Sequence, residues 1–333
     1  MRARGASRWY PTFVSSRTAL ADEAVRFDLV VACEICAHIY INGNPLTTGP
    51  SARFISETPR ELLLLAGGLP SARVGGAQII GAAVPPDTAA AFVKVLSEIG
   101  AFHADYLGVP PAPLPDILTI EPLRRPRRGE LWGFYSDPSL ALLGASISRL
   151  TGVLQGDSLP PQRNVYTFLA HELAHHYFGW KVGAGTTQRD FFGEPFATFL
   201  ELKALRARYG EEEYQRAVGR LRDRVLDGPE PVSPEVATQE EIERARYGSA
   251  PLLLLALETV IGEARMRALL GALVRAPDVE KRGADLAYLR SVGLGVGVDR
   301  ALWERWERQC LRTPLQQNFC LRSLGEGAEG DVR

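Results

Sequence analysis

The chain has 333 residues, 46% of them hydrophobic, so it can bury a large core as one large domain or two of ordinary size. Its 38 Lys and Arg and 39 Asp and Glu side chains give a formal net charge of -1. The chain as a whole therefore has no positive electrostatic field that would attract nucleic acid. No apolar run is long enough for a membrane span, and no apolar segment follows the basic N-terminus as in a signal peptide. We therefore expect a globular, cytoplasmic protein with no nucleic-acid partner and no membrane span.

The first part of the chain has the pattern of short β-strands. Apolar or alternating runs such as "AVRFDLVVAC", "AHIYING" and "ELLLLAGG" are separated by Asn, Gly and Pro. Residues 86–108 then show helical spacing and end at Gly108, and residues 116–146 again read as strands. The sequence thus predicts a small mixed sheet ahead of the segment that is richest in histidine.

From about residue 162 onward the pattern is helical. Gly179, Gly210 and Gly262 mark helix ends or turns, and Thr238 with Glu241 forms a capping-box signal. The predicted helices cover residues 162–178, 194–209, 211–226, 239–247, 251–274, 283–291 and 298–311. A β layer followed by a helical half indicates an α+β fold.

The four cysteines do not define a metal site by themselves. Cys33 and Cys36 form a lone CxxC in a segment that reads as a continuing strand, where such residues point to opposite faces. We expect separate core thiols there, because a zinc ribbon would need a second CxxC. Pairing of Cys310 with Cys320 stays open.

The segment "TFLAHELAHHYFGW" holds three of the five histidines and suggests a metal site. On a helix, His171 and His175 lie one turn apart on the same face and can ligate one metal ion. Glu172 lies about 100° round the helix, within reach of a water at that site. His176 is off this face and is expected to pack or to lie at the surface. The alternative for the whole segment is an amphipathic helix with exposed or core histidines.

A catalytic zinc site needs a third protein ligand and one open position. Glu194 opens the next predicted helix, at a distance that allows the two helices to pack antiparallel. A carboxylate there would complete a His2Glu set. Glu201, seven residues later, would orient a ligand or be solvated.

These motifs resemble the zinc aminopeptidases of the membrane-alanyl-aminopeptidase type, peptidase family M-one of the gluzincin clan. Their signature is HExxH, eighteen residues and then Glu, and "HELAHHYFGW" with "FFGEPFATFLE" is similar at nearly every functional position. "RYGSAPLLLLALETVIGEARMRALL" resembles the segment of the family's tyrosine, here Tyr247, and "RRGELWGFY" resembles the G-A-M-E-N-W-G strand, with Glu130 at its glutamate. The resemblance covers most of residues 85–315.

The resemblance implies a thermolysin-like catalytic domain over residues 86–324 and a partial β-rich N-terminal domain over 1–85. The polar composition of residues 325–333 predicts a flexible tail. The resemblance also implies one Zn²⁺ per chain, held by His171, His175 and Glu194. Glu172 would be the general base for a zinc-activated water, and Tyr247 would stabilise the oxyanion. Glu130 would bind the free amino group of a peptide substrate.

The sequence departs from the family pattern around Glu130, where Leu131 replaces the motif's asparagine, and the chain is shorter than usual for the family. An aminopeptidase is therefore the leading hypothesis. A zinc endopeptidase or other zinc hydrolase without a strict need for a free amine is the alternative. A catalytically weak peptide- or protein-binding domain is the hypothesis from another class. Side-chain preference, physiological substrate and oligomeric state stay open.

Overall fold

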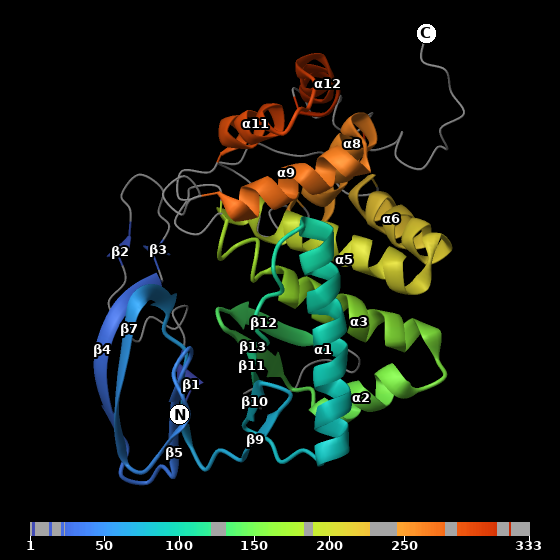
Figure 1. Ribbon diagram of the computed structural model, residues 1–333. Coiled ribbons are helices and arrows are strands. Elements are labelled where there is room, and N and C mark those ends of the chain that lie inside the picture. Colours follow the sequence, from blue (N-terminus) through green and yellow to red (C-terminus); the bar gives the residue numbers. More distant parts are fainter. Residues whose placement is uncertain are drawn as a thin grey trace. The chain divides into compact units, whose positions relative to one another are not determined.

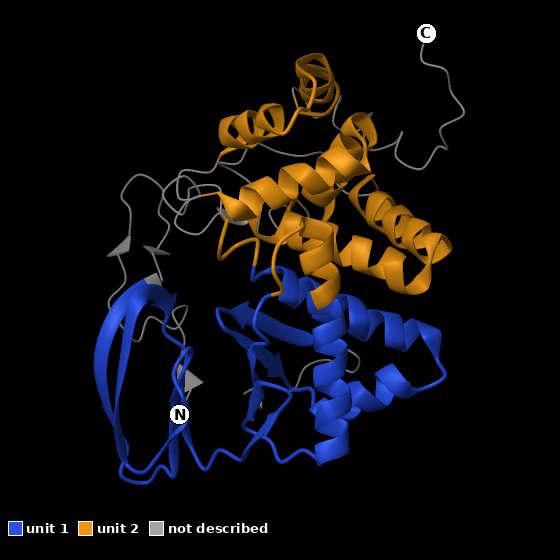
Figure 2. Ribbon diagram, in the orientation of Figure 1, with its two compact units in different colours: residues 1–100, 112–176 blue, residues 101–111, 177–333 orange. Residues whose placement is uncertain are grey.

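The computed structural model describes residues 2–3, 13–14, 21–22, 24–120, 131–182, 189–226, 245–276, 285–311 and 320. The chain divides into two compact units, residues 1–100 with 112–176 and residues 101–111 with 177–333 (Figure 2). Every strand of the described residues belongs to the first unit, and the described elements of the second are helices. The predicted α+β class, with a β-rich first part and a helical half, is confirmed (Figure 1).

The N-terminal strands form a small four-stranded sheet and two antiparallel pairs. The sheet has the order β1-β8-β5-β6, and β4 pairs with β7 and β2 with β3. These strands are β1 (Arg2–Ala3), β2 (Phe13–Val14), β3 (Ala21–Asp22), β4 (Ala24–Ala32), β5 (His38–Ile41), β6 (Thr47–Thr48), β7 (Ser51–Glu61) and β8 (Leu64–Gly67).

The second sheet is five-stranded and mixed, with the order β12-β13-β11-β10-β9. Its central strands run parallel, with Ile79 opposite Ile117 and Leu118 opposite Ala141. Its members are β9 (Ser71–Val74), β10 (Ala77–Ile80), β11 (Asp116–Ile120), β12 (Trp132–Ser136) and β13 (Ser139–Leu143). The sheet takes strands from both sides of residue 85, and a domain boundary at that residue stays a prediction.

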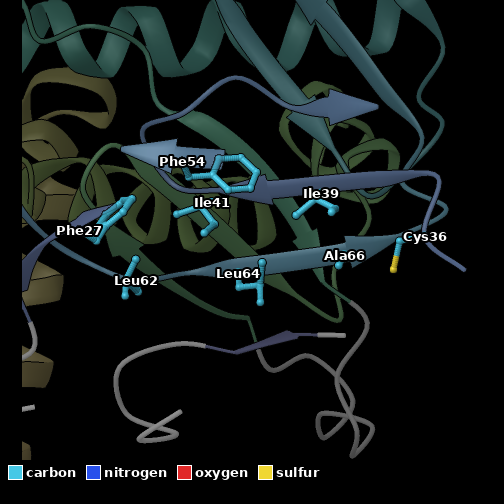
Figure 3. Close-up of a cluster of buried hydrophobic side chains, with 8 residues drawn as sticks. All are labelled: Phe27, Cys36, Ile39, Ile41, Phe54, Leu62, Leu64 and Ala66. Carbon is cyan, nitrogen blue, oxygen red and sulfur yellow. The ribbon is translucent and has the colours of Figure 1, made fainter. Parts of the chain in front are cut away.

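Two apolar layers hold the strands of the first unit together. Figure 3 shows one of them, between the β4–β7 pair and the four-stranded sheet, around Phe27, Ile41 and Phe54. The other layer joins the two sheets, with Tyr40 and Leu65 from one and residues such as Leu118 from the other. Burial of side chains on both faces of β5 and β8 explains why those strands are continuous apolar runs.

Three helices contribute to the first unit. α1 (Pro86–Leu107) agrees with the prediction and ends before Gly108, whose φ of 61° suits glycine. α2 (Ile147–Gln155) was not predicted, and the side chain of Ser146 caps it by accepting a hydrogen bond from the Arg149 backbone. α3 (Leu159–Ala174) packs against α2 and contacts β12.

The second unit is built on α5 (Glu194–Tyr209), which packs against α6 (Glu211–Leu226) and α8 (Ala250–Ile261). The predicted bounds of α5 and α6 are confirmed. The other elements are α4 (Arg189–Phe192), η2 (Ala245–Ser249), α9 (Glu263–Arg275), α11 (Leu286–Gly295), α12 (Arg300–Trp306) and η3 (Glu307–Leu311). The capping box at Thr238 and Glu241 and most of the predicted helix 239–247 lie outside the described residues.

The predicted long helix over 251–274 is two helices. Gly262 adopts a φ of 85° between α8 and α9, a conformation in which its backbone no longer continues the helix. Among the described residues, none of the helices is long and apolar enough to cross a bilayer.

The prediction of separate thiols at Cys33 and Cys36 is wrong. β4 ends at Ala32, and a turn in which Cys36 donates a backbone hydrogen bond to Cys33 brings the two side chains together in a disulfide. Cys310 and Cys320, which the sequence left open, are also paired.

Candidate metal centre

α3 carries the HExxH segment and is oriented by its apolar face. Leu169 and Leu173 on this helix are buried, which leaves the face with His171 and His175 half-buried. The two imidazole rings lie 4.9 Å apart between centroids and nearly perpendicular to each other, as expected for residues one helical turn apart. The helix therefore presents two metal-ligand side chains side by side.

Glu194 is the first residue of α5, which is anchored by almost continuous burial of the following residues. One ligand atom from each of His171, His175 and Glu194 lies within 4.8 Å of the others. Within the described ranges, this is the one group of three His, Cys, Asp or Glu residues that meets this distance. Two imidazoles and one carboxylate are the donor set of His2Glu catalytic zinc sites, so the residues present fit zinc.

The proposed catalytic residues occupy different settings. Glu172 lies on α3 between the two histidines and is 7% exposed. Tyr247 is 41% exposed and lies in η2, the π-helical turn that leads directly into α8. Because η2 packs against α5, Tyr247 and Glu194 come from neighbouring elements of the second unit. Glu130 lies outside the described residues, so its substrate-binding role stays a prediction.

The strand that would carry the substrate contacts lies against the metal helix. A Cβ on Gly133 of β12 would lie 2.7 Å from the ring of Phe168 of α3 and 2.6 Å from the Ala141 carbonyl oxygen. Glycine at this position therefore permits the close approach of α3 to β12. Trp132, beside it, is exposed.

Two residues near the centre were missed by the sequence analysis. Tyr135 and Asp137 follow Trp132 along the chain and contact His176, whose Nδ1 lies 3.1 Å from the Tyr135 hydroxyl and 3.3 Å from Asp137 Oδ1. Burial raises the pKa of Asp137, but the hydrogen bonds with His176 and Tyr135 outweigh it and hold the pKa below its ordinary value. His176 is buried and lies outside the candidate ligand set, as expected.

Comparison with known proteins finds relatives that are named as probable aminopeptidases. No family model matches the chain. It is 28% identical over 172 residues to "Probable aminopeptidase 1" of Saccharolobus solfataricus, a match that covers 48% of this chain and 20% of that protein. It is 30% identical over 136 residues to "Probable aminopeptidase 2" of Sulfurisphaera tokodaii, covering 37% of this chain and 17% of the relative. The matched region thus spans about one fifth of these relatives.

Solved structures show the same fold. The M1 zinc metallopeptidase from Deinococcus radiodurans superposes with a TM-score of 0.55 at 20% identity, covering 86% of this chain and 63% of that one. Yeast LTA4 hydrolase gives a TM-score of 0.60 at 16% identity, covering 87% and 48%. The fold is that of the M1 zinc metallopeptidases, and the resemblance indicated by the motifs is confirmed.

Proposed function

We propose that this chain is a zinc-dependent metallopeptidase that removes N-terminal residues from peptides. The observation that carries the proposal is the convergence of ligand atoms from His171, His175 and Glu194 within 4.8 Å. The relatives of this chain are named as probable aminopeptidases, which supports the choice of reaction.

When bound, zinc would polarise the scissile carbonyl and make a water molecule more acidic. Glu172 then accepts a proton from the attacking water and delivers it to the leaving amine. Tyr247 donates its phenolic hydrogen to the oxygen on which negative charge develops, a contact that gains strength in the transition state. Glu130 pairs with the substrate's ammonium group and so selects peptides with a free N-terminus.

Metal analysis together with hydrolysis of aminoacyl arylamides tests the proposal. Glu172→Gln keeps the size of the side chain but removes the base, so turnover should fall by roughly 10²–10⁴-fold while zinc content is unchanged. The matched control is Glu98→Gln, at an exposed glutamate paired with Lys94 on α1, which should leave turnover at the wild-type level. Stoichiometric zinc without any turnover that depends on Glu172 would favour the binding-domain hypothesis.

The exopeptidase restriction has its own test. A peptide with a free amino group and the same peptide with an acetylated N-terminus are compared in the wild type and in Glu130→Gln. We expect cleavage of the free peptide alone, and a loss of that preference in the variant. Equal cleavage of both peptides by the wild type would favour the zinc endopeptidase alternative.

The cytoplasmic location expected from the sequence stays a prediction. The two disulfides weigh against it, since stable disulfides form mainly in oxidising compartments. Fractionation of the producing cells, followed by immunodetection of the chain, decides between the cytoplasm and an oxidising compartment outside it.

A further inference from the structure

The metal helix ends at its second ligand. α3 stops at Ala174, and His175 occupies the C-cap position. In this last turn the backbone of His175 donates to the Glu172 carbonyl at 3.3 Å and that of His176 to Leu173 at 3.2 Å, so both bonds span three residues rather than four. Helix ends fray and are held less firmly than helix interiors. The backbone of His175 therefore gains less support from the helix than that of His171, one turn earlier.

His176, the residue after this ligand, is held by side chains that lie outside α3. His176 is buried, and its Nδ1 lies within hydrogen-bond distance of the Tyr135 hydroxyl and of Asp137 Oδ1. The Tyr135 ring also meets the imidazole edge to face, with centroids 6.2 Å apart. These contacts link the end of α3 to the end of β12.

The partners of His176 are themselves fixed by a buried amide. Asn42 is fully buried, and its Nδ2 donates to Ser136 Oγ and to the Asp137 carbonyl oxygen, both at 3.3 Å. Its Oδ1 accepts a hydrogen bond from the Leu63 backbone at 2.9 Å. The turn after β12 is thus tied to the N-terminal strands, and all these residues belong to the first unit.

We propose that Tyr135, Asp137 and His176 form a positioning network that holds His175 in the geometry needed to ligate the metal, with Asn42 as its support in the N-terminal sheet. Outer partners that orient a ligand typically change metal affinity by about 10–100-fold when removed. Here the network acts on the backbone of the neighbouring residue. This inference rests on the metal site of the proposed function.

A pair of matched variants tests the network. Tyr135→Phe and Tyr40→Phe each remove one buried phenolic hydroxyl that contacts an aspartate in the first unit. Tyr135 donates to Asp137 Oδ1 at 3.1 Å, and Tyr40 donates to Asp116 Oδ2 at 2.7 Å. Zinc affinity is measured by competition with a chelator, and the site's geometry by the visible spectrum of the Co²⁺-substituted protein. Tyr135→Phe should weaken zinc binding about tenfold, the lower end for an outer partner, and shift the cobalt bands. Tyr40→Phe should change neither.

Two substitutions of His176 test whether a polar atom at the position of its Nδ1 is enough to keep the zinc affinity. Asn places its amide near the position of histidine Nδ1, the atom that makes both contacts, whereas Phe fills the space without a polar atom. His176→Asn should therefore stay within about threefold of wild-type zinc affinity, and His176→Phe should lose about tenfold or more.

The outcomes separate this inference from the proposed function. Wild-type protein that binds no zinc would overturn both. Zinc-loaded wild type together with equal affinities and equal cobalt spectra in Tyr135→Phe and Tyr40→Phe would overturn the network alone. Equal losses in both tyrosine variants would show a general effect of stability and would also overturn it.

Discussion

His103 offers a test of how the core of the second unit is built. Its side chain is fully buried, in ring contact with Phe102 and Tyr177, and neither ring nitrogen has a hydrogen-bond partner among the described residues. Burial lowers the pKa of this imidazole from 6.5 to about 3. The folded protein therefore keeps His103 neutral at pH values where the unfolded chain already binds a proton.

This difference in pKa makes stability depend on pH. The stability is fully retained above the unfolded pKa and is lost as the pH falls below it, because the unfolded state gains the proton first. Between about pH 7.5 and pH 5 the contribution of this single group amounts to a loss of about 2 kcal/mol in the free energy of unfolding. His103→Leu removes the titrating group, so the decline over this range should be smaller by that amount.

Urea unfolding at several pH values, followed by tryptophan fluorescence, measures this slope. The other four histidines are present in both proteins, so any effect of theirs cancels in the difference. Phe102→Leu is the control: it reduces packing on the same helix and should lower stability by the same amount at every pH. Parallel pH profiles for wild type and His103→Leu would refute the assignment of a buried, neutral His103.

Three further predictions concern stability and oxidation state. Lys203→Met breaks a buried ion pair and leaves Glu258 uncompensated, so the free energy of unfolding should fall by about 3–5 kcal/mol; adding Glu258→Leu should recover most of it, as measured by urea unfolding. Gly271→Ala should destabilise despite the better helix propensity of alanine, because its Cβ would lie 2.2 Å from the Leu107 carbonyl oxygen, whereas Gly219→Ala meets nothing within 4 Å and should stabilise by about 0.5–1 kcal/mol in the same assay. Thiol counting by alkylation and mass spectrometry should find all four cysteines oxidised before reduction and reactive after it in denaturant; alkylation before reduction would contradict the pairing.

Much of the fold could be predicted where local signals coincide. The bounds of α5 and α6 follow from helical spacing on either side of Gly210, whose φ of 89° ends one helix before the next begins. The disulfide at Cys33 could not be predicted in this way, because the sequence reads as a strand that continues through it. Whether a strand ends in a turn depends on its pairing partner: β4 pairs with β7 only as far as Ala32, opposite Ser51.

In the candidate site, too, local sequence signals predict some of the residues and long-range contacts determine the others. His171 and His175 are one turn apart on one helix, so their convergence is a local property. Glu194 was predicted from its spacing to these histidines together with the family resemblance. The contacts of His176 join residues 39 and 41 positions apart. No local pattern encodes them, since they depend on the position of β12 against α3, a close approach that glycine at position 133 allows.

The ends of the two ligand-bearing helices match the charges of a metal site. His175 follows the last residue of α3, where unpaired carbonyl groups give the helix a partial negative charge that favours a cation. Glu194 is the first residue of α5, where the partial positive charge of the helix stabilises an ionised carboxylate. Each such placement contributes about 0.3–1 kcal/mol when exposed and more when partly buried. A pair of histidines that merely packed would need no carboxylate at the start of α5, so the electrostatics of the helix ends and the chemistry of the donors both favour a divalent cation here.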